Sequence, residues 1–214
     1  MTSGKALLAV LVLLCGSAVA SAQGSDPGAG KLEVGFFPGG GTFFVSGDDD
    51  LEVNFNTYNF GGHVSWYLHR LLAVEGELGF GIGLAQDVNY ENRVVRHVQV
   101  PGTTSVSGNV LVFPMGSDRL IAGYLTGGGG LLTLQNRVST RQFGLTESES
   151  FGATNAGGGL KILRGGTGLQ RWGARIDYRL LFVNSKDDAV AFFARSKRRI
   201  GHRIYVGFLY TLTR

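Results

Sequence analysis

The sequence predicts an all-β protein in which eight antiparallel strands close into an up-and-down barrel. Three observations support this fold class: segments of alternating apolar and polar residues, connections that alternate between short and long, and a glycine-rich composition. Glycine supplies 35 of the 214 residues, about twice its ordinary share. Hydrophobic residues make up 43 %, which excludes a disordered chain. The single cysteine excludes a disulfide scaffold, and no apolar run reaches the length of about 18 residues that a transmembrane helix needs.

The first 22 residues have the features of a secretory signal peptide. Lys5 precedes an apolar stretch at 6–15, and Ala20 and Ala22 place small residues at the expected cleavage positions. We therefore divide the chain into a signal peptide at 1–22, a short leader at 23–30 and a β-barrel at 31–214.

Alternation with a period of two is clearest at 172–183. Its even positions are apolar, whereas Arg175, Asp177 and Arg179 occupy the opposite face. The other segments that alternate lie at 31–45, 58–68, 71–85, 103–113, 120–135, 151–163 and 203–213. Several of these strands exceed the length of about 9 to 11 residues with which a β-strand crosses a membrane.

The connections predict which strand ends lie together. Short connections are expected at 69–70, 114–119 and 164–171. Longer, polar connections are expected at 46–56, 86–102, 136–150 and 184–202. In transmembrane barrels the short turns face the periplasm and the long loops face outward, so we expect both chain ends on the periplasmic side.

A soluble eight-stranded barrel is the alternative, because alternation alone does not say which face meets water. The signal peptide favours a membrane barrel, as do aromatic residues beside the short turns, namely Trp66, Tyr67, Trp172 and Tyr210. Glycine on the polar face suits a narrow interior. The glycines assigned to that face are Gly79, Gly81, Gly83, Gly123, Gly127, Gly129, Gly157 and Gly159. We therefore predict an eight-stranded antiparallel up-and-down transmembrane β-barrel of the bacterial outer membrane.

The strand number, the loop rhythm and the C-terminal segment resemble the small outer-membrane β-barrel family that includes the OmpA-type and OmpX-type domains. The resemblance covers about 31–214. The ending Tyr205-Val-Gly207-Phe-Leu-Tyr210-Thr-Leu212 is similar to the family's C-terminal assembly signal, although this chain ends on Thr213-Arg214 instead of an aromatic residue. The resemblance implies insertion by the barrel assembly machinery, with Tyr205, Gly207, Tyr210 and Leu212 as the signal.

Parity assigns five positive and four negative residues to the barrel lumen. These residues are Lys31, Glu33, Glu75, Glu77, Lys161, Arg175, Asp177, Arg179 and Arg203. Unpaired charges in a narrow interior are costly, so we expect them to form a plug of ion pairs. Eight strands leave an interior that side chains can fill. The alternative is a narrow path for small solutes.

A run of basic residues in the last long connection is a candidate contact with lipopolysaccharide phosphates. Its members are Arg195, Lys197, Arg198 and Arg199. The alternative is a solvated loop. The acidic run at 48–50 is expected to be a solvated loop tip rather than a Ca²⁺ site.

His63 and Ser65 resemble the His/Ser pair of the outer-membrane lipid A deacylases. Their expected place near a periplasmic turn and their inward orientation oppose catalysis. We therefore expect a structural or surface-interaction protein rather than an enzyme, with no cofactor and no metal. The expected partners are outer-membrane lipid, lipopolysaccharide and the assembly machinery, with no nucleic acid, and the expected state is a monomer.

Overall fold

The computed structural model describes residues 29–46, 54–90, 93–135, 148–164, 171–184 and 198–212. Ten strands occur among them. They are β1 (Leu32–Ser46), β2 (Phe55–His69), β3 (Leu72–Gly83), β4 (Ala85–Tyr90), β5 (Arg93–Gln99), β6 (Gly102–Val112), β7 (Ile121–Gln135), β8 (Glu149–Arg164), β9 (Arg171–Asn184) and β10 (Arg198–Leu212). No helix in these ranges is long and apolar enough to cross a membrane.

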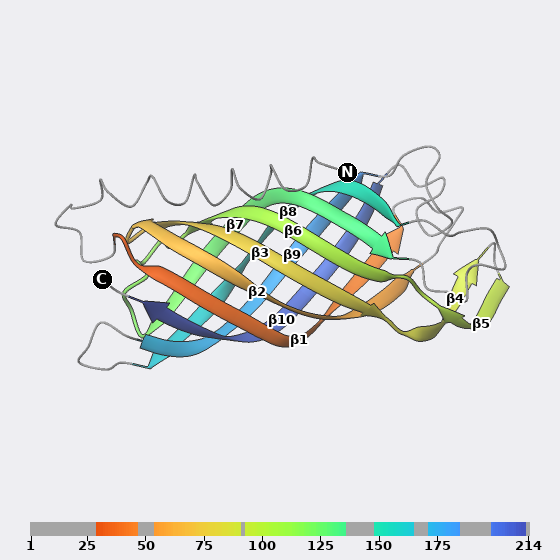
Figure 1. Ribbon diagram of the computed structural model, residues 1–214, viewed down its shortest axis with the longest axis horizontal. Helices are drawn as coiled ribbons and strands as arrows, with labels where there is room; N and C mark the ends of the chain where they lie inside the picture. Colours follow the sequence, from red (N-terminus) through yellow and green to blue (C-terminus); the bar gives the residue numbers. More distant parts are fainter. Residues whose placement is uncertain are drawn as a thin grey trace, which may run out of the picture.

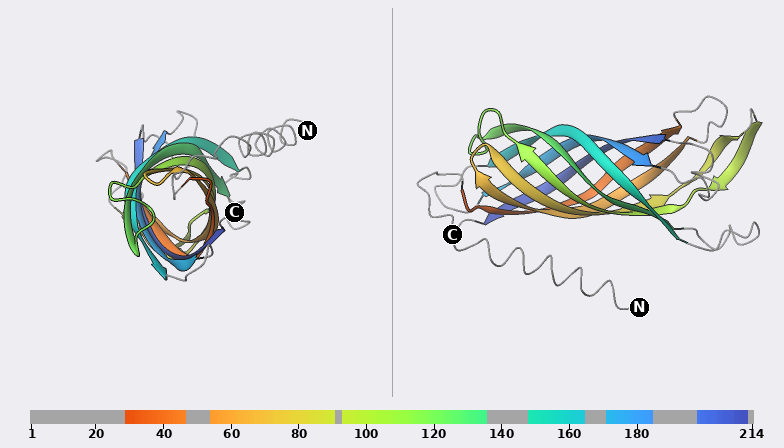
Figure 2. Two further views of the ribbon diagram at one scale, coloured as in Figure 1. Left: turned by 90° about the vertical axis from the view of Figure 1, so that its left-hand side faces the viewer. Right: turned by 90° about the horizontal axis from the view of Figure 1, so that it is seen from above.

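Eight of the strands close into an antiparallel barrel, which confirms the predicted fold class (Figure 1). The order around the barrel is β1-β10-β9-β8-β7-β6-β3-β2. Pairing between β1 and β10 closes the ring, which Figure 2 shows in an end-on view. We call the end of the barrel that carries the β2–β3, β6–β7 and β8–β9 connections the short-turn end. The opposite end, from which the β4–β5 hairpin extends, is the long-loop end.

The remaining two strands correct the prediction for 86–102, which was expected to be a loop. β4 and β5 form a separate two-stranded sheet that extends beyond the long-loop end (Figure 1). β-branched Val94, Val95 and Val98 favour a strand there. At its base, the Asn56 amide donates to Gln86 Oε1, and Gln86 Nε2 donates to the Asn56 carbonyl, both at 3.0 Å. The Gln86 side chain thereby extends strand-like pairing from β2 to the hairpin.

β1 contains a bulge that breaks its alternation. The register with β10 shifts between Phe36 and Gly39, and Pro38 within this interval has no backbone N–H to give to a ladder. Before the bulge Glu33 and Phe37 are buried, and after it Thr42 is buried, so the inward parity changes from odd to even. Because of this change, a single alternation does not run through the whole of 31–45.

The outer surface of the barrel is apolar and its interior holds the charges. On β9, Trp172 is 57 % exposed and Ile176 is 44 % exposed, whereas Arg175, Asp177 and Arg179 are fully buried. Large exposed hydrophobic side chains occur on all eight barrel strands. This is the orientation that a transmembrane barrel requires.

Two groups of residues face the other way from the prediction. Tyr67, expected at the aromatic rim, points into the lumen and is 4 % exposed, whereas Trp172 and Tyr210 do face outward. Gly123, Gly127 and Gly129 were assigned to the lumen but face outward. The reason is the parity of β7, where the neighbouring Ala122, Tyr124 and Thr126 are the buried residues.

Close approach inside the barrel requires glycine at position 61. A Cβ atom there would collide with the Leu78 carbonyl oxygen and would lie 2.6 Å from Phe37 Cζ. Gly76 faces outward and nothing lies within 4 Å of its Cβ position. We therefore expect Gly61→Ala to lower the free energy of unfolding by about 1–3 kcal/mol and Gly76→Ala to change it by less than about 0.5 kcal/mol. Urea unfolding in lipid vesicles measures both values, and equal losses would contradict the packing described here.

Candidate functional site: the packed lumen

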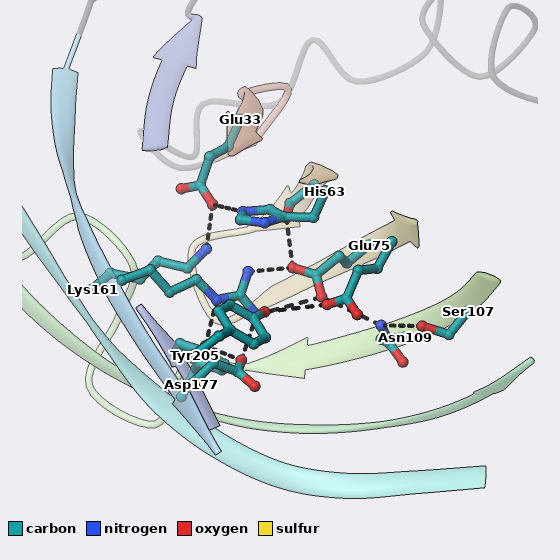
Figure 3. A network of polar contacts seen from close by, with 12 residues as sticks. Glu33, His63, Glu75, Ser107, Asn109, Lys161, Asp177 and Tyr205 are labelled. Atoms are coloured by element: carbon teal, nitrogen blue, oxygen red, sulfur yellow. Dashed lines mark hydrogen bonds and ion pairs between the residues drawn. The ribbon is translucent and has the colours of Figure 1, made fainter. Parts of the chain in front are cut away.

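The centre of the lumen is a network of ion pairs between strands on opposite sides of the barrel (Figure 3). Arg175 on β9 binds Glu75 on β3, with Nη1 2.5 Å from Oε2. Arg179 Nη2 lies 2.7 Å from the other oxygen of Glu75. One carboxylate therefore joins two guanidinium groups across the lumen.

Asp177 lies between the same two arginines and completes the network. Its Oδ2 lies 2.7 Å from Arg175 Nη2, and its Oδ1 lies 2.8 Å from Arg179 Nε. It also accepts a short hydrogen bond from the Tyr124 hydroxyl, which in turn accepts one from Arg175 Nε at 2.6 Å. Charge-assisted bonds of this kind satisfy polar atoms that have no access to bulk water.

A third carboxylate extends the network toward the long-loop end. Glu77 Oε1 lies 2.6 Å from Arg203 Nη2, and its Oε2 lies 3.4 Å from Arg179 Nη1. The Tyr205 hydroxyl donates to Glu77 at 3.2 Å, and the Tyr205 ring stacks on Phe37 at the β1 bulge. The network therefore reaches the seam where β1 and β10 close the barrel.

Lys161 forms a separate centre nearer the short-turn end. Its ammonium lies 2.5 Å from Glu33 Oε1 and donates to the Tyr67 hydroxyl at 2.9 Å. The rings of Tyr67, Phe113 and Tyr124 surround it, with centroids 5.2–5.5 Å away. A carboxylate and three aromatic faces thus replace the water that this buried cation has lost.

The structure places eight of the nine predicted lumen charges in these two centres. Four are positive and four are negative: Lys161, Arg175, Arg179 and Arg203 against Glu33, Glu75, Glu77 and Asp177. Lys31, the ninth, lies just before β1 and is half-buried at the short-turn end. The charges of the two centres balance.

His63 and Ser65 are both buried in the lumen, but each turns toward a different carboxylate. His63 Nε2 lies 3.6 Å from Glu33 Oε1, and a Cβ at Gly35 on the facing strand would collide with the His63 ring. The Ser65 hydroxyl donates to Glu75 Oε2 at 3.1 Å. The Ser65 proton is therefore directed to Glu75 rather than to a histidine base.

Apolar layers lie at both ends of the ionic network. At the long-loop end the layer consists of Phe44, Phe55, Val100, Leu132, Leu134, Phe151 and Val183. At the short-turn end it consists of Tyr67, Ala73, Leu111, Phe113, Ala122 and Tyr124. Val100 comes from the segment between β5 and β6, so the hairpin connection itself contributes to the outer layer.

These layers, together with the tyrosines, are what sequence reasoning missed. Tyr67, Tyr124 and Tyr205 each join a hydroxyl to the ionic network, although Tyr67 was assigned to a membrane rim, Tyr205 to the assembly signal and Tyr124 to no role. The sequence does indicate that Tyr205 faces the lumen, because its parity along the strand matches that of Arg203. Tyr67 shares its parity with Ser65 and His63, which were assigned to the lumen.

The predicted lipopolysaccharide contact is only partly within the described residues. Arg195 and Lys197 lie outside them, as does the acidic run at 48–50. β10 begins at Arg198, earlier than expected, and this places Arg199 inside the barrel opposite Val183, with 1 % of its surface exposed. Arg199 is therefore corrected from an exposed rim residue to a lumen residue.

The predicted assembly-signal residues divide between the two faces of β10. Tyr205 and Gly207 point inward, and Tyr210 and Leu212 are exposed on the outer surface. A Cβ at Gly207 would lie 3.1 Å from the Cβ of Phe37, the inward residue of the β1 bulge. The small residue at 207 thus makes room for the bulge at the closing seam.

No cluster of three or more His, Cys, Asp or Glu side chains that could hold a metal ion occurs in the described ranges. The arrangement as a whole, a closed eight-stranded barrel with an apolar exterior and a packed, charged interior, is the architecture of a small transmembrane β-barrel.

Solved structures similar to this chain are small outer-membrane barrels. The N-terminal β-barrel domain of OprF from Pseudomonas aeruginosa matches with a TM-score of 0.48 and 13 % identity, over 85 % of this chain and 98 % of that domain. OprG from Pseudomonas aeruginosa matches with a TM-score of 0.44 and 11 % identity, over 88 % and 99 %. Ail of Yersinia pestis matches with a TM-score of 0.39 and 14 % identity, over 85 % and 99 %. No family model and no curated protein matches the sequence.

The shared carboxylate of Glu75 gives a direct test of the network. Glu75→Gln removes one of the two carboxylates that Arg175 and Arg179 share and leaves three buried positive charges against two negative ones in this centre, so we expect the free energy of unfolding to fall by about 3–5 kcal/mol. Asp87→Asn, on the exposed hairpin, is the matched control and should change it by less than about 1 kcal/mol. Urea unfolding in vesicles measures both. Similar small losses from the two variants would show that the network adds little to stability.

Proposed function

We propose that the protein is a closed outer-membrane β-barrel with a structural or surface-interaction role, and that its long loops face outward. The observation that carries this proposal is the combination of an apolar outer surface with a lumen filled by paired charges between two apolar layers. In this role the barrel is a membrane anchor, and the interacting surface is the part of the chain beyond the long-loop end.

The apolar exterior supports a location in a membrane. Phe36 is 53 % exposed, Val206 53 % and Phe208 65 %, all on neighbouring strands. A contiguous apolar surface that surrounds a barrel is far larger than the patches that soluble monomers expose. Burial of this surface in acyl chains removes it from water, and the closed ring leaves no strand edge unpaired in the hydrocarbon.

The filled lumen favours a structural role over the alternative of a narrow solute path. A permeating solute would have to separate Glu75 from two arginines and pass the ring of aromatic side chains around Lys161. The engagement of Ser65 with Glu75 likewise gives no support to the third candidate, a lipid-modifying enzyme.

The proposed orientation puts the short turns in the periplasm, as in other transmembrane barrels. The proposed partners are outer-membrane lipid, lipopolysaccharide at Arg195, Lys197 and Arg198, and the barrel assembly machinery at the outer face of β10. We propose that the barrel acts as a monomer, since its own ring of strands is complete.

We expect the full chain, expressed in a Gram-negative bacterium, to fractionate with the outer membrane. The folded barrel should migrate differently on electrophoresis before and after boiling, because detergent alone does not open a closed ring of strands. Recovery in the soluble periplasmic fraction, with unchanged migration on boiling, would instead support a soluble barrel.

We expect the purified barrel in planar bilayers to show no stepwise openings of the size seen with a general diffusion porin, which serves as the positive control in the same bilayer. The physical reason is the packed ionic network between two apolar layers. Regular openings of porin size in the unmodified protein would contradict the plug and favour the transport alternative.

A further inference from the structure

Exposed arginines occupy three of the turns and strand ends at the short-turn end. Arg70 lies in the β2–β3 turn, Arg119 in the β6–β7 turn, and Arg164 at the end of β8; all three are exposed. We call these three residues the basic rim.

The charge at this end is one-sided. The described residues at or beyond the short-turn ends of the strands carry five positive charges, at Lys31, Arg70, Arg119, Arg164 and Arg171, against one negative charge at Asp118. The two ionic centres of the lumen, by contrast, hold four positive and four negative charges. An excess of this kind produces a positive potential at the surface that attracts anions.

The basic rim is built on turns that are tied to one another. The Ser117 amide donates to the Arg70 carbonyl at 2.8 Å, which joins the β6–β7 turn to the β2–β3 turn. The Leu163 amide donates to the Leu120 carbonyl at 2.7 Å, and Arg171 Nη1 donates to the Asp118 carbonyl at 2.9 Å. The three arginines therefore project from a continuous, hydrogen-bonded base.

Apolar side chains lie directly beside these cations. The Arg164 guanidinium lies over the ring of Trp172, 5.6 Å from its centroid, and that ring is 57 % exposed on the outer face. Leu120, next to Arg119, is 62 % exposed, and Leu71, next to Arg70, is 37 % exposed. A cation that flanks an outward aromatic or aliphatic group matches the boundary between acyl chains and head groups.

We propose that the basic rim binds the phosphate head groups of anionic phospholipids in the leaflet that the short-turn end faces. The proposal rests on the proposed membrane insertion. Charge complementarity selects an anion, and the adjacent apolar side chains select an anion that is attached to acyl chains over a soluble one. Each arginine near an anionic surface contributes about 1 kcal/mol, which corresponds to about a fivefold preference.

The two tryptophans of the chain make this end of the barrel directly observable. Trp66 and Trp172 lie on β2 and β9 near their short-turn ends, and the chain has no other tryptophan. Lipids brominated near the head-group end of their acyl chains quench tryptophan by contact. The full chain is refolded into phosphatidylcholine vesicles that contain a fixed mole fraction of brominated phosphatidylglycerol or, in parallel, of brominated phosphatidylcholine.

We expect brominated phosphatidylglycerol to quench more strongly, with a relative association about three- to fivefold higher than that of brominated phosphatidylcholine. The triple variant R70Q/R119Q/R164Q should lose this preference. The matched control R93Q/R96Q, on β5 at the other end of the barrel, should keep it. Added NaCl should weaken the preference of the unmodified protein, which tests the proposal even if the triple variant fails to fold.

Each contrary result has a distinct meaning. Equal quenching by the two lipids would overturn the basic-rim proposal and leave membrane insertion intact. Absence of quenching by both lipids would overturn membrane insertion, and the basic rim with it. If soluble glycerophosphoglycerol abolished the preference beyond the effect of NaCl at equal ionic strength, the rim would be a small-anion site and the proposal of a lipid surface would be wrong.

Discussion

The rest of the structure depends on the sharing of two carboxylates by two arginines inside the barrel. Glu75 and Asp177 each contact both Arg175 and Arg179, and all four side chains are buried. Removal of a charge from water costs several kcal/mol, and a partner at hydrogen-bond distance must offset that cost. Because Glu75 lies on β3 and the arginines lie on β9, the offset exists only when the barrel is closed and the strands are in this register. The network therefore selects one register as well as occupying space.

The outer surface imposes the complementary constraint. Each strand must present apolar side chains to the outside and charged or small ones to the inside, and a slip of one residue exchanges the two sets. On β9 such a slip would move Arg175, Asp177 and Arg179 outward while moving Trp172 and Ile176 inward. A register slip of one residue would therefore lose both the burial of apolar side chains in hydrocarbon and the ion pairs in the lumen. An exception is the bulge at Pro38, where the parity of β1 changes and Gly207 on the neighbouring strand leaves room for Phe37.

The sequence predicts the features that depend on local alternation. The barrel strands and eight of the nine proposed lumen charges follow from a period of two, which the chain carries with few interruptions. It does not predict contacts between distant strands, so the three rings around Lys161 and the use of Tyr67 in the lumen become visible only in the folded barrel. Arg199 was misassigned for a related reason. A basic run resembles a solvated loop, and the extent of β10 is set by pairing with β9 and β1 rather than by composition.

The two ends of the barrel are built for different tasks. At the short-turn end the connections are brief, hydrogen-bonded to one another and sealed beneath by a layer of aromatic side chains. At the long-loop end the seal is aliphatic and aromatic, and it includes Val100 from the segment that follows the β4–β5 hairpin. A change in the hairpin would therefore affect this outer layer first. Uncharged polar side chains, such as Thr57 and Asn59, separate the outer layer from the ionic network. Because of this separation, a change in an outer connection leaves the ion pairs of the two centres in place.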